Sequence, residues 1–297
     1  MPKFKILSID GGGIKGLLSS TLIERLSDAV PTLITTVDML AGTSTGGIIA
    51  LGIAAGLSPS TISSLYKNQG ADIFDDSWFH DIKEMHGFIG AHYDNTKLHQ
   101  IIQQYFGSKS LQDLTKKVLI PTFNLHATNP DRWEVHFMHN FAGGDGTLSL
   151  VDAAMSTSAA PTYFETWGSK IDGGVACNQP SMAAVAQAID SGINLQDIIV
   201  LSLGTGFCPS FINGQNLDWG DAQWLQPLIQ ILLDSGAPVA EIQCRQILKD
   251  HYFRLNPTFP DGVKIALDDY KRAHELINIA QATDIKPTLD WLNFNWN

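Results

Sequence analysis

The sequence predicts a three-layer α/β/α fold with a mainly parallel central sheet. Two observations carry this prediction: short apolar runs that end in polar or glycine-rich turns recur along the chain, and stretches with apolar residues at helical spacing lie between them. Several of the runs are continuous enough for strands that are buried on both faces, as in parallel sheets. In such folds, ligands bind at the carboxyl ends of the strands.

The predicted elements alternate between strands and helices in chain order. The predicted strands are Phe4 to Ile9, Met39 to Ala41, Val118 to Leu125, Val135 to Met138 and Ile198 to Leu203. Four predicted helices have the following apolar faces: Ile14, Leu17, Leu18, Leu22 and Leu26; Leu98, Ile101, Ile102 and Tyr105; Trp224, Leu225, Leu228, Ile231 and Leu232; and Ala273, Leu276, Ile277 and Ala280.

The domain organisation follows from the absence of internal divisions. The 297 residues contain no repeat, no low-complexity stretch and no proline-rich linker. We therefore predict one domain over residues 1–297, with a motif-bearing core at about 4–206 and a helical C-terminal part at about 207–297.

Composition narrows the possible functions. Hydrophobic residues make up 44% of the chain and charged residues 16%, which allows a sizeable core. The net charge of -11 disfavours nucleic acid as a partner. No signal peptide or transmembrane run is evident, so we expect a cytoplasmic protein by default, with peripheral membrane association or signal-independent secretion as the alternatives. The three cysteines and nine histidines lack the spacing of a disulfide framework or a zinc site, and no metal is expected.

The first of three glycine-rich turns follows the first predicted strand and reads Asp10-Gly11-Gly12-Gly13-Ile14-Lys15-Gly16. Backbone N–H groups that converge at a helix N-terminus favour negative charge. The anion could be a phosphate, because Gly11, Gly13 and Gly16 also satisfy the GxGxxG pattern of dinucleotide-binding proteins. It could equally be the oxyanion of an acyl-transfer transition state.

The second turn, Gly42-Thr43-Ser44-Thr45-Gly46, has the pattern GxSxG between a predicted strand and a predicted helix. In a nucleophile elbow, the serine lies on such a strand-to-helix turn, and the flanking glycines allow close approach of the backbones. The structural alternative is a helix cap by Ser44 or Thr45.

The third turn, Asp172-Gly173-Gly174, supplies a candidate base for Ser44, since no histidine stands in a comparable turn. A carboxylate of ordinary pKa is a weak base for an alcohol, so this role needs a short contact and a partly desolvated Asp172. On the residues alone, Asp172 could equally be a turn former.

Together the three turns resemble the three signatures of patatin-like phospholipases, in order and in spacing. The segments Ala159 to Phe164 and Leu201 to Gly206 are similar to that family as well. The resemblance is clear over about the first two hundred residues and loose beyond them, and three linked motifs are far more specific than one.

This resemblance implies a calcium-independent lipid acyl hydrolase of the phospholipase A type that works without a cofactor. Ser44 would be the nucleophile, Asp172 the general base, and the N–H groups of Gly11, Gly12 and Gly13 the oxyanion hole. A phospholipid or another lipid acyl ester would be the substrate. Supporting roles fall to Lys15, Gly16, Gly42, Gly46, Gly173 and Gly174. The sequence departs from the family at Asn178-Gln179-Pro180, where two asparagines often precede the proline.

The sequence leaves two alternative functions open, and it does not decide where two aromatic segments lie. A noncatalytic lipid-binding or storage protein would keep the pocket without turnover, and a dinucleotide-binding oxidoreductase would use the first turn and leave Ser44 idle. Each aromatic segment could either dip into a lipid interface or pack on the core. The segments are Ile73, Phe74, Trp78 and Phe79, with Asp72, Asp75 and Asp76 among them, and the C-terminal Trp291, Phe294 and Trp296.

Overall fold

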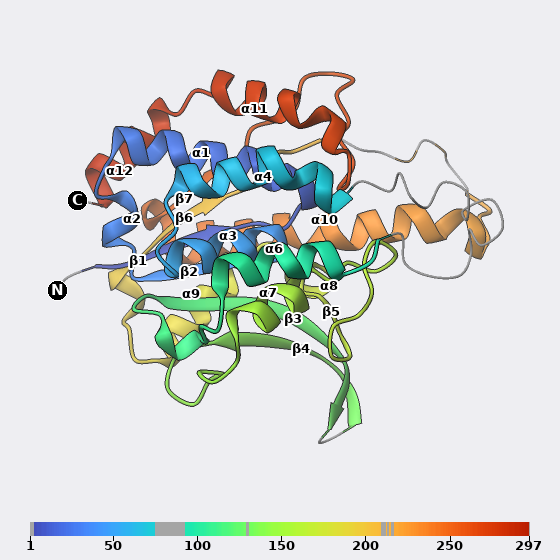
Figure 1. Ribbon diagram of the computed structural model, residues 1–297. Coiled ribbons are helices and arrows are strands. Elements are labelled where there is room, and N and C mark those ends of the chain that lie inside the picture. The colour runs from blue at the N-terminus through green and yellow to red at the C-terminus, as the bar shows by residue number, and fades with distance from the viewer. Residues whose placement is uncertain are drawn as a thin grey trace.

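The centre of this computed structural model is a seven-stranded sheet (Figure 1). The structure describes residues 3–74, 93–128, 131–208, 212, 214 and 217–296. The strand order is β4-β3-β2-β1-β6-β7, and β5 pairs with β3. The neighbours β3, β2, β1, β6 and β7 are parallel, whereas β4 and β5 run antiparallel to β3. The strands are β1 (Phe4–Ile9), β2 (Met39–Gly42), β3 (Lys117–Thr128), β4 (Asp131–His139), β5 (Lys170–Asp172), β6 (Ile198–Leu203) and β7 (Tyr252–Leu255).

The two faces of the sheet pack into two separate cores. Because side chains alternate along a strand, Leu7 and Ile9 of β1 join one core while Ile6 joins the other. Neighbouring strands repeat this division, as Leu40 and Met39 of β2 illustrate. Both faces are therefore covered, which explains why these strands are mostly apolar in the sequence.

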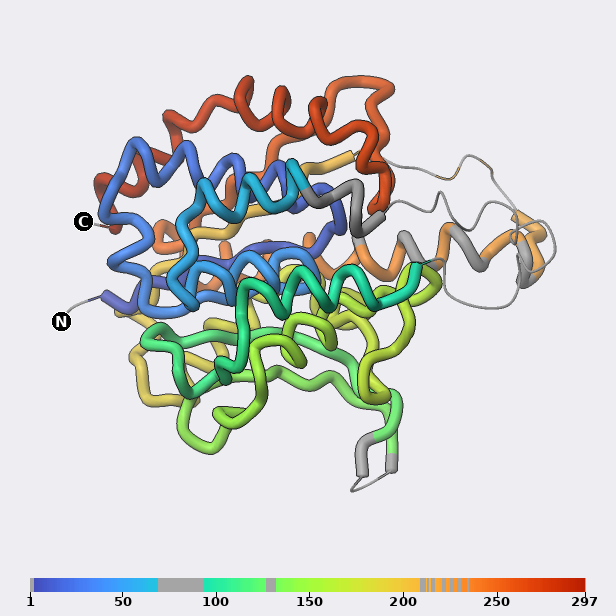
Figure 2. Tube along the Cα trace, viewed as in Figure 1, coloured from blue at the N-terminus to red at the C-terminus, as the bar shows by residue number. Residues whose placement is uncertain are grey.

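Helices cover both faces, and the predicted three-layer α/β/α fold is confirmed (Figures 1 and 2). Helices α9 and α10 pack on one face, and most of the remaining helices contribute to the other core. The helices are α1 (Gly16–Ala29), α2 (Leu33–Thr36), α3 (Thr45–Ala54), α4 (Pro59–Phe74), α6 (Thr96–Phe106), α7 (Leu150–Ser158), α8 (Gly174–Cys177), α9 (Ser181–Asp190), α10 (Asp221–Leu248), α11 (Ala273–Ala282) and α12 (Lys286–Asn295).

Strand β5 is short, but its position determines the arrangement at the carboxyl edge of the sheet. One edge of β3 pairs with β4, and the other pairs first with β2, as Ala41 opposite Leu119 shows. Beyond the end of β2, that second edge pairs with β5, where Thr122 lies opposite Asp172. The end of β5 is thus brought next to the end of β2.

The predicted strands Phe4 to Ile9 and Ile198 to Leu203 have the observed bounds, and the other three are longer than predicted. The C-terminal part, expected to be helical, contains α10, α11 and α12 and also β7, which extends the sheet next to β6. β7 has only four residues, one of which is the charged Arg254, so it is too short to stand out as an apolar run in the sequence.

The C-terminal aromatic residues have different environments. Trp296 is 1% exposed, belongs to the core and donates a hydrogen bond to the Thr36 hydroxyl (3.1 Å), so the interfacial hypothesis fails for this residue. Trp291 packs against the same core, whereas Phe294 is 85% exposed. Of the other aromatic segment, Trp78 and Phe79 lie outside the described residues.

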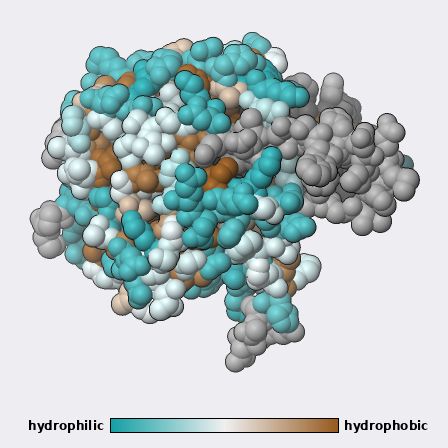
Figure 3. All heavy atoms as spheres, in the orientation of Figure 1, coloured by the Kyte–Doolittle hydropathy of each residue, from teal (hydrophilic) through white to brown (hydrophobic). Residues whose placement is uncertain are grey.

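The surface in Figure 3 carries small, separate hydrophobic areas among hydrophilic ones. Within the described ranges, no helix combines the length and the apolar character that crossing a membrane requires.

We predict that Trp296→Ala lowers the free energy of unfolding by about 3–5 kcal/mol, because it leaves a large cavity in the core. The matched change Phe294→Ala in the same helical region should lie within about 0.5 kcal/mol of the wild type, since that ring is exposed. Urea denaturation followed by circular dichroism measures both. Equal effects of the two substitutions would contradict the core position of Trp296.

Candidate active site

Ser44 lies on a sharp turn between β2 and α3, the strand–turn–helix context that GxSxG requires. Its φ of 54° is positive, an uncommon conformation for a residue with a side chain. The turn is held from outside: the Ser44 N–H donates to the Thr157 hydroxyl (2.9 Å), which donates in turn to the Pro121 carbonyl (2.6 Å). The hydroxyl of Ser44 is thereby presented at the edge of the sheet.

Glycines at this turn allow backbones to touch. A Cβ on Gly46 would lie 2.3 Å from the Ile9 carbonyl oxygen, and one on Gly42 would lie 2.1 Å from the Gly46 carbonyl oxygen. A side chain on Gly46 would push the turn away from β1, and one on Gly42 would force the turn itself open, so both glycines are required for the observed backbone.

Asp172 ends β5 and is 3% exposed. The Gly174 N–H donates to its Oδ1 (2.7 Å), and Ser44 lines the same pocket as this carboxyl group. Burial raises the pKa of Asp172 from 3.8 to about 6, although the neighbouring Ser44 hydroxyl and Gly174 N–H lower it. Gly173 packs against Pro121, where a Cβ would lie 2.2 Å from the carbonyl oxygen. The predicted pair of Ser44 and Asp172, 128 positions apart in the sequence, is thus brought together in one pocket, where the Ser44 hydroxyl is near enough to lower the pKa of the carboxyl group.

The first glycine turn lies beside this pair, and its three backbone N–H groups differ in their hydrogen bonding. The Gly11 N–H donates to the Asn178 carbonyl (3.1 Å), so it is already engaged. Within the described part of the chain, no hydrogen-bond partner is found for the N–H groups of Gly12 and Gly13. Gly13 has a φ of 58° and passes close to the Leu267 carbonyl. All three glycines line the same pocket as Ser44 and Asp172.

Two further residues support the serine turn from the side of α1 and α4. Gly16, at the start of α1, lets the Thr45 side chain approach: a Cβ there would lie 2.1 Å from Oγ1. The Thr45 hydroxyl donates to the Tyr66 hydroxyl (2.5 Å), which donates to the Thr45 carbonyl (3.0 Å). Tyr66 is buried, which raises the pKa of its hydroxyl. The sequence offers no motif that singles it out.

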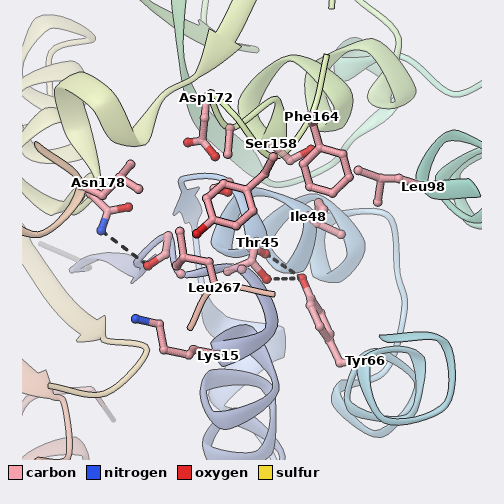
Figure 4. A pocket seen from close by; sticks show the side chains of 17 residues that line it. Lys15, Thr45, Ile48, Tyr66, Leu98, Ser158, Phe164, Asp172, Asn178 and Leu267 are labelled. Carbon is pink, nitrogen blue, oxygen red and sulfur yellow. Dashed lines mark hydrogen bonds between the residues drawn. The ribbon is translucent and has the colours of Figure 1, made fainter. Parts of the chain in front are cut away.

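The pocket has a polar and an apolar side (Figure 4). Asn178 and Lys15 lie on one side, whereas Ile48 and Leu98 lie on the other. Lys15 is 8% exposed and lies two residues after Gly13. Further lining residues from the segment that resembles the patatin-like family are Ala160, Tyr163 and Phe164.

A buried ion pair supports the glycine turn from behind. Asp10 precedes the glycines, and its carboxylate accepts hydrogen bonds from both terminal nitrogens of Arg254 on β7, at 2.6 and 3.3 Å. Both side chains are 5% exposed, and Glu241 of α10 lies 3.1 Å from Arg254 Nε. Although burial alone would lower it, the neighbouring Asp10 carboxylate raises the pKa of the Arg254 guanidinium, which stays charged. Nothing in the sequence pattern indicated this pair.

The segment that departs from the family pattern also contacts the glycine turn. The Asn178 side-chain nitrogen lies 3.5 Å from the Gly11 carbonyl oxygen, which also accepts a hydrogen bond from the Thr205 hydroxyl (3.0 Å). Gln179 is buried, and its side-chain amide donates to the Tyr252 hydroxyl (3.2 Å). Glutamine at this position therefore connects the loop after Asp172 to β7.

The sequence also matches a known protein family. The model of the family "Patatin-like phospholipase" matches residues 7–185, which include all three glycine turns. The chain belongs to the patatin-like phospholipase family. Membership supports lipid acyl hydrolase activity, and the names of several relatives agree with a phospholipase.

The similarity to individual relatives covers more of the chain than the family model does. The protein is 29% identical to Protein teg of Priestia megaterium, over 100% of both chains, and 28% identical to the putative sporulation hydrolase CotR of Bacillus subtilis, over 100% of this chain and 99% of the other. It is 30% identical to a cGAMP-activated phospholipase of Escherichia coli, over 69% of this chain and 62% of that one. A solved structure of the ExoU–SpcU complex of Pseudomonas aeruginosa matches with a TM-score of 0.46 and 16% identity, over 95% of this chain and 52% of that one.

Within the residues that the structure describes, no group of three or more histidine, cysteine, aspartate or glutamate side chains is arranged to hold a metal ion.

We predict that Arg254→Met lowers the free energy of unfolding by about 3–5 kcal/mol, because it leaves the Asp10 carboxylate buried without a partner. Replacing both partners, as Asp10→Asn with Arg254→Met, should recover at least half of the loss. The matched control is Arg132→Met, which breaks an exposed ion pair with Glu134 and should cost about 1 kcal/mol or less. Urea titrations of the four proteins test this; a double variant as unstable as Arg254→Met would refute the buried-charge explanation.

Proposed function

We propose that this protein is a calcium-independent lipid acyl hydrolase of the phospholipase A type, with Ser44 as the nucleophile and Asp172 as the general base. The observation that carries this proposal is the proximity of the Ser44 hydroxyl to the buried Asp172 carboxyl, beside the N–H groups of Gly12 and Gly13, for which the described residues offer no hydrogen-bond partner. Nucleophile, base and oxyanion donors are the three groups that hydrolysis of an ester through an acyl-enzyme needs.

The reaction begins when the Asp172 carboxylate accepts the proton of Ser44 Oγ, which attacks the carbonyl carbon of the ester. The negative charge that develops on the carbonyl oxygen is stabilised by the N–H groups of Gly12 and Gly13. Gly11 was expected to contribute as well, but its N–H is directed to Asn178, and we assign it the role of holding the turn.

Collapse of the tetrahedral intermediate breaks the bond to the alcohol oxygen, which takes the proton from Asp172. The acyl group stays on Ser44 as an ester. Water then attacks this ester, with Asp172 accepting its proton, and the carboxylic acid and the free serine are released. Asp172 releases each proton that it accepts, so Ser44 and Asp172 are ready for the next turnover.

The apolar side of the pocket supports a lipid acyl chain as the substrate group. Ile48, Leu98 and Phe164 lie close to the serine turn and would remove an alkyl chain from water. Lys15 and Asn178 lie on the polar side, and we assign the alcohol part of a phospholipid to that side.

A dinucleotide-binding oxidoreductase finds no support in the glycine turn. In a dinucleotide site, glycines leave space for the pyrophosphate to approach the backbone. Here the protein itself occupies that space: a Cβ on Gly11 would meet Asn178 at 2.2 Å, and one on Gly12 would meet Thr205 at 2.4 Å. A noncatalytic lipid-binding protein would need neither the raised pKa of Asp172 nor its contact with Ser44.

We predict that Ser44→Ala and Asp172→Asn each lower the rate of ester hydrolysis at least about 1,000-fold, because they remove the nucleophile or its base. Turnover of a synthetic phospholipid measures this, and circular dichroism checks that both variants stay folded. A fluorophosphonate should label the wild type but not Ser44→Ala. Comparable turnover in either folded variant would overturn the assignment.

Calcium independence is tested with the same substrate. Because Asp172 and the two amides supply the base and the oxyanion donors, hydrolysis should proceed at the same rate with a calcium chelator as with added calcium. Loss of activity in the chelator, restored by calcium, would contradict this part of the proposal.

We predict that kcat/KM rises with pH and levels off above pH of about 6. Asp172 must be ionised to act as a base, and its pKa of about 6 in the folded protein means that the active form is lost as the pH falls through that value. Below it, kcat/KM should fall about tenfold per unit. A pH–rate profile, with near-ultraviolet circular dichroism at each pH to confirm folding, measures this. A profile that stays flat down to the ordinary aspartate value of 3.8 would show that no base with a pKa raised to about 6 controls the reaction.

A further inference from the structure

A second cavity adjoins the catalytic pocket on its apolar side. It lies between α3, α4 and α6, and it shares three lining residues with the catalytic pocket: Ile48, Tyr66 and Leu98. We call it the distal pocket. Since the same three side chains face both spaces, a ligand that passes them extends from one pocket into the other.

The walls of the distal pocket are apolar. Its lining includes Ile62, Leu65, Ile101 and Phe106, and no described residue that lines it carries a charge. The hydroxyl of Tyr66 is engaged with Thr45, so the ring, rather than the polar atom, is offered to the cavity. A polar or charged group in this space would lose its hydrogen bonds to water without replacement.

Helix α3 leads from the nucleophile to this cavity. Ile48 and Gly52 follow Ser44 at intervals of four residues, so they lie on the same side of α3 and succeed one another by roughly one turn each. Gly52 therefore lies about 12 Å along the helix from the serine. An acyl chain attached to Ser44 could follow this face of α3.

Gly52 forms part of the far wall. A Cβ at this position would lie 3.2 Å from Ile62 Cδ1 and 3.4 Å from Leu57 Cδ1. A methyl group thus already meets both side chains, and anything larger would occupy the cavity. Glycine is disfavoured inside a helix, and here its missing side chain preserves the space.

We propose that the distal pocket binds the far end of the acyl chain of the substrate, and that Gly52 and Ile62 determine the chain length that the enzyme prefers. The inference rests on the proposed function and adds a specificity site to it. Each methylene group buried in the pocket strengthens binding by roughly fourfold, so that longer chains gain until the pocket is filled. Beyond that length, further methylenes gain nothing there.

The test compares kcat/KM for p-nitrophenyl esters of butanoic, octanoic, dodecanoic and hexadecanoic acid, all presented in the same micelles. In Gly52→Val, the dodecanoyl-to-butanoyl ratio should fall at least about tenfold, because the added side chain displaces methylenes from the pocket. Ile62→Ala removes side-chain atoms from the same wall, which enlarges the distal pocket, and should shift the preferred acyl-chain length upward. The matched control is Ala50→Val, a buried position of α3 outside the lining, which should change the ratio by about twofold or less.

A variant on a second wall of the distal pocket keeps the test valid even where a substitution in α3 disturbs folding. Ile101→Phe fills the distal pocket from α6, where Ile101 is only partly buried, and should lower the same ratio. An unchanged ratio in both folded variants, Gly52→Val and Ile101→Phe, would overturn the proposal.

Binding separates this inference from the proposed function. In a Ser44→Ala background, dodecanoate should bind at least about tenfold more tightly than butanoate by calorimetry, and Gly52→Val should abolish that difference. If the wild type hydrolyses no ester but fatty-acid binding depends on Gly52, the proposed function fails and the distal pocket stands. If hydrolysis depends on Ser44 while chain-length preference and binding ignore Gly52, the proposed function stands and the distal pocket is refuted.

Discussion

Close approach of backbones at the carboxyl edge of the sheet is the constraint on which the site depends. The turn after β1 and the turn after β2 touch through Gly46 and the Ile9 carbonyl, at a separation that excludes a side chain. Because these turns end parallel neighbours, small shifts in either would separate the amides of Gly12 and Gly13 from Ser44. Pairing of β5 with β3 then brings Asp172 to the same place. Backbone packing, more than any single side chain, sets the geometry.

Segments far apart in the sequence share the task of holding this geometry. Arg254 on β7 lies outside the region matched by the family model, and yet it is paired with Asp10 directly before the glycines. Glu241 on α10 holds the same guanidinium, and Gln179 connects the loop after Asp172 to β7. The C-terminal part is therefore a structural support for the motif-bearing core rather than an appendage to it.

Much of the fold could be predicted because burial on both faces leaves a mark in the sequence. β1 and β6 are mostly apolar, and their bounds were predicted correctly; β4 is an edge strand in which polar and apolar residues alternate at the start, and only Val135 to Met138 was recognised. The three glycine turns were recognisable because glycine is required where backbones touch. The Asp10–Arg254 pair and the Tyr66 contact were not, since a long-range contact between single side chains leaves no periodicity or spacing. The engagement of the Gly11 amide likewise depends on tertiary structure alone.

The burial of Asp172 has a thermodynamic consequence for the whole molecule. In the unfolded chain, this carboxyl group releases its proton near 3.8, whereas in the folded protein it does so at about 6. Between these values the folded state binds a proton that the unfolded state does not, so this group makes folding less favourable as the pH rises through the window. Above it, the full penalty remains, on the order of 3 kcal/mol. The ionised form that would activate Ser44 is thus the form that strains the fold, and at this residue stability and reactivity favour opposite protonation states.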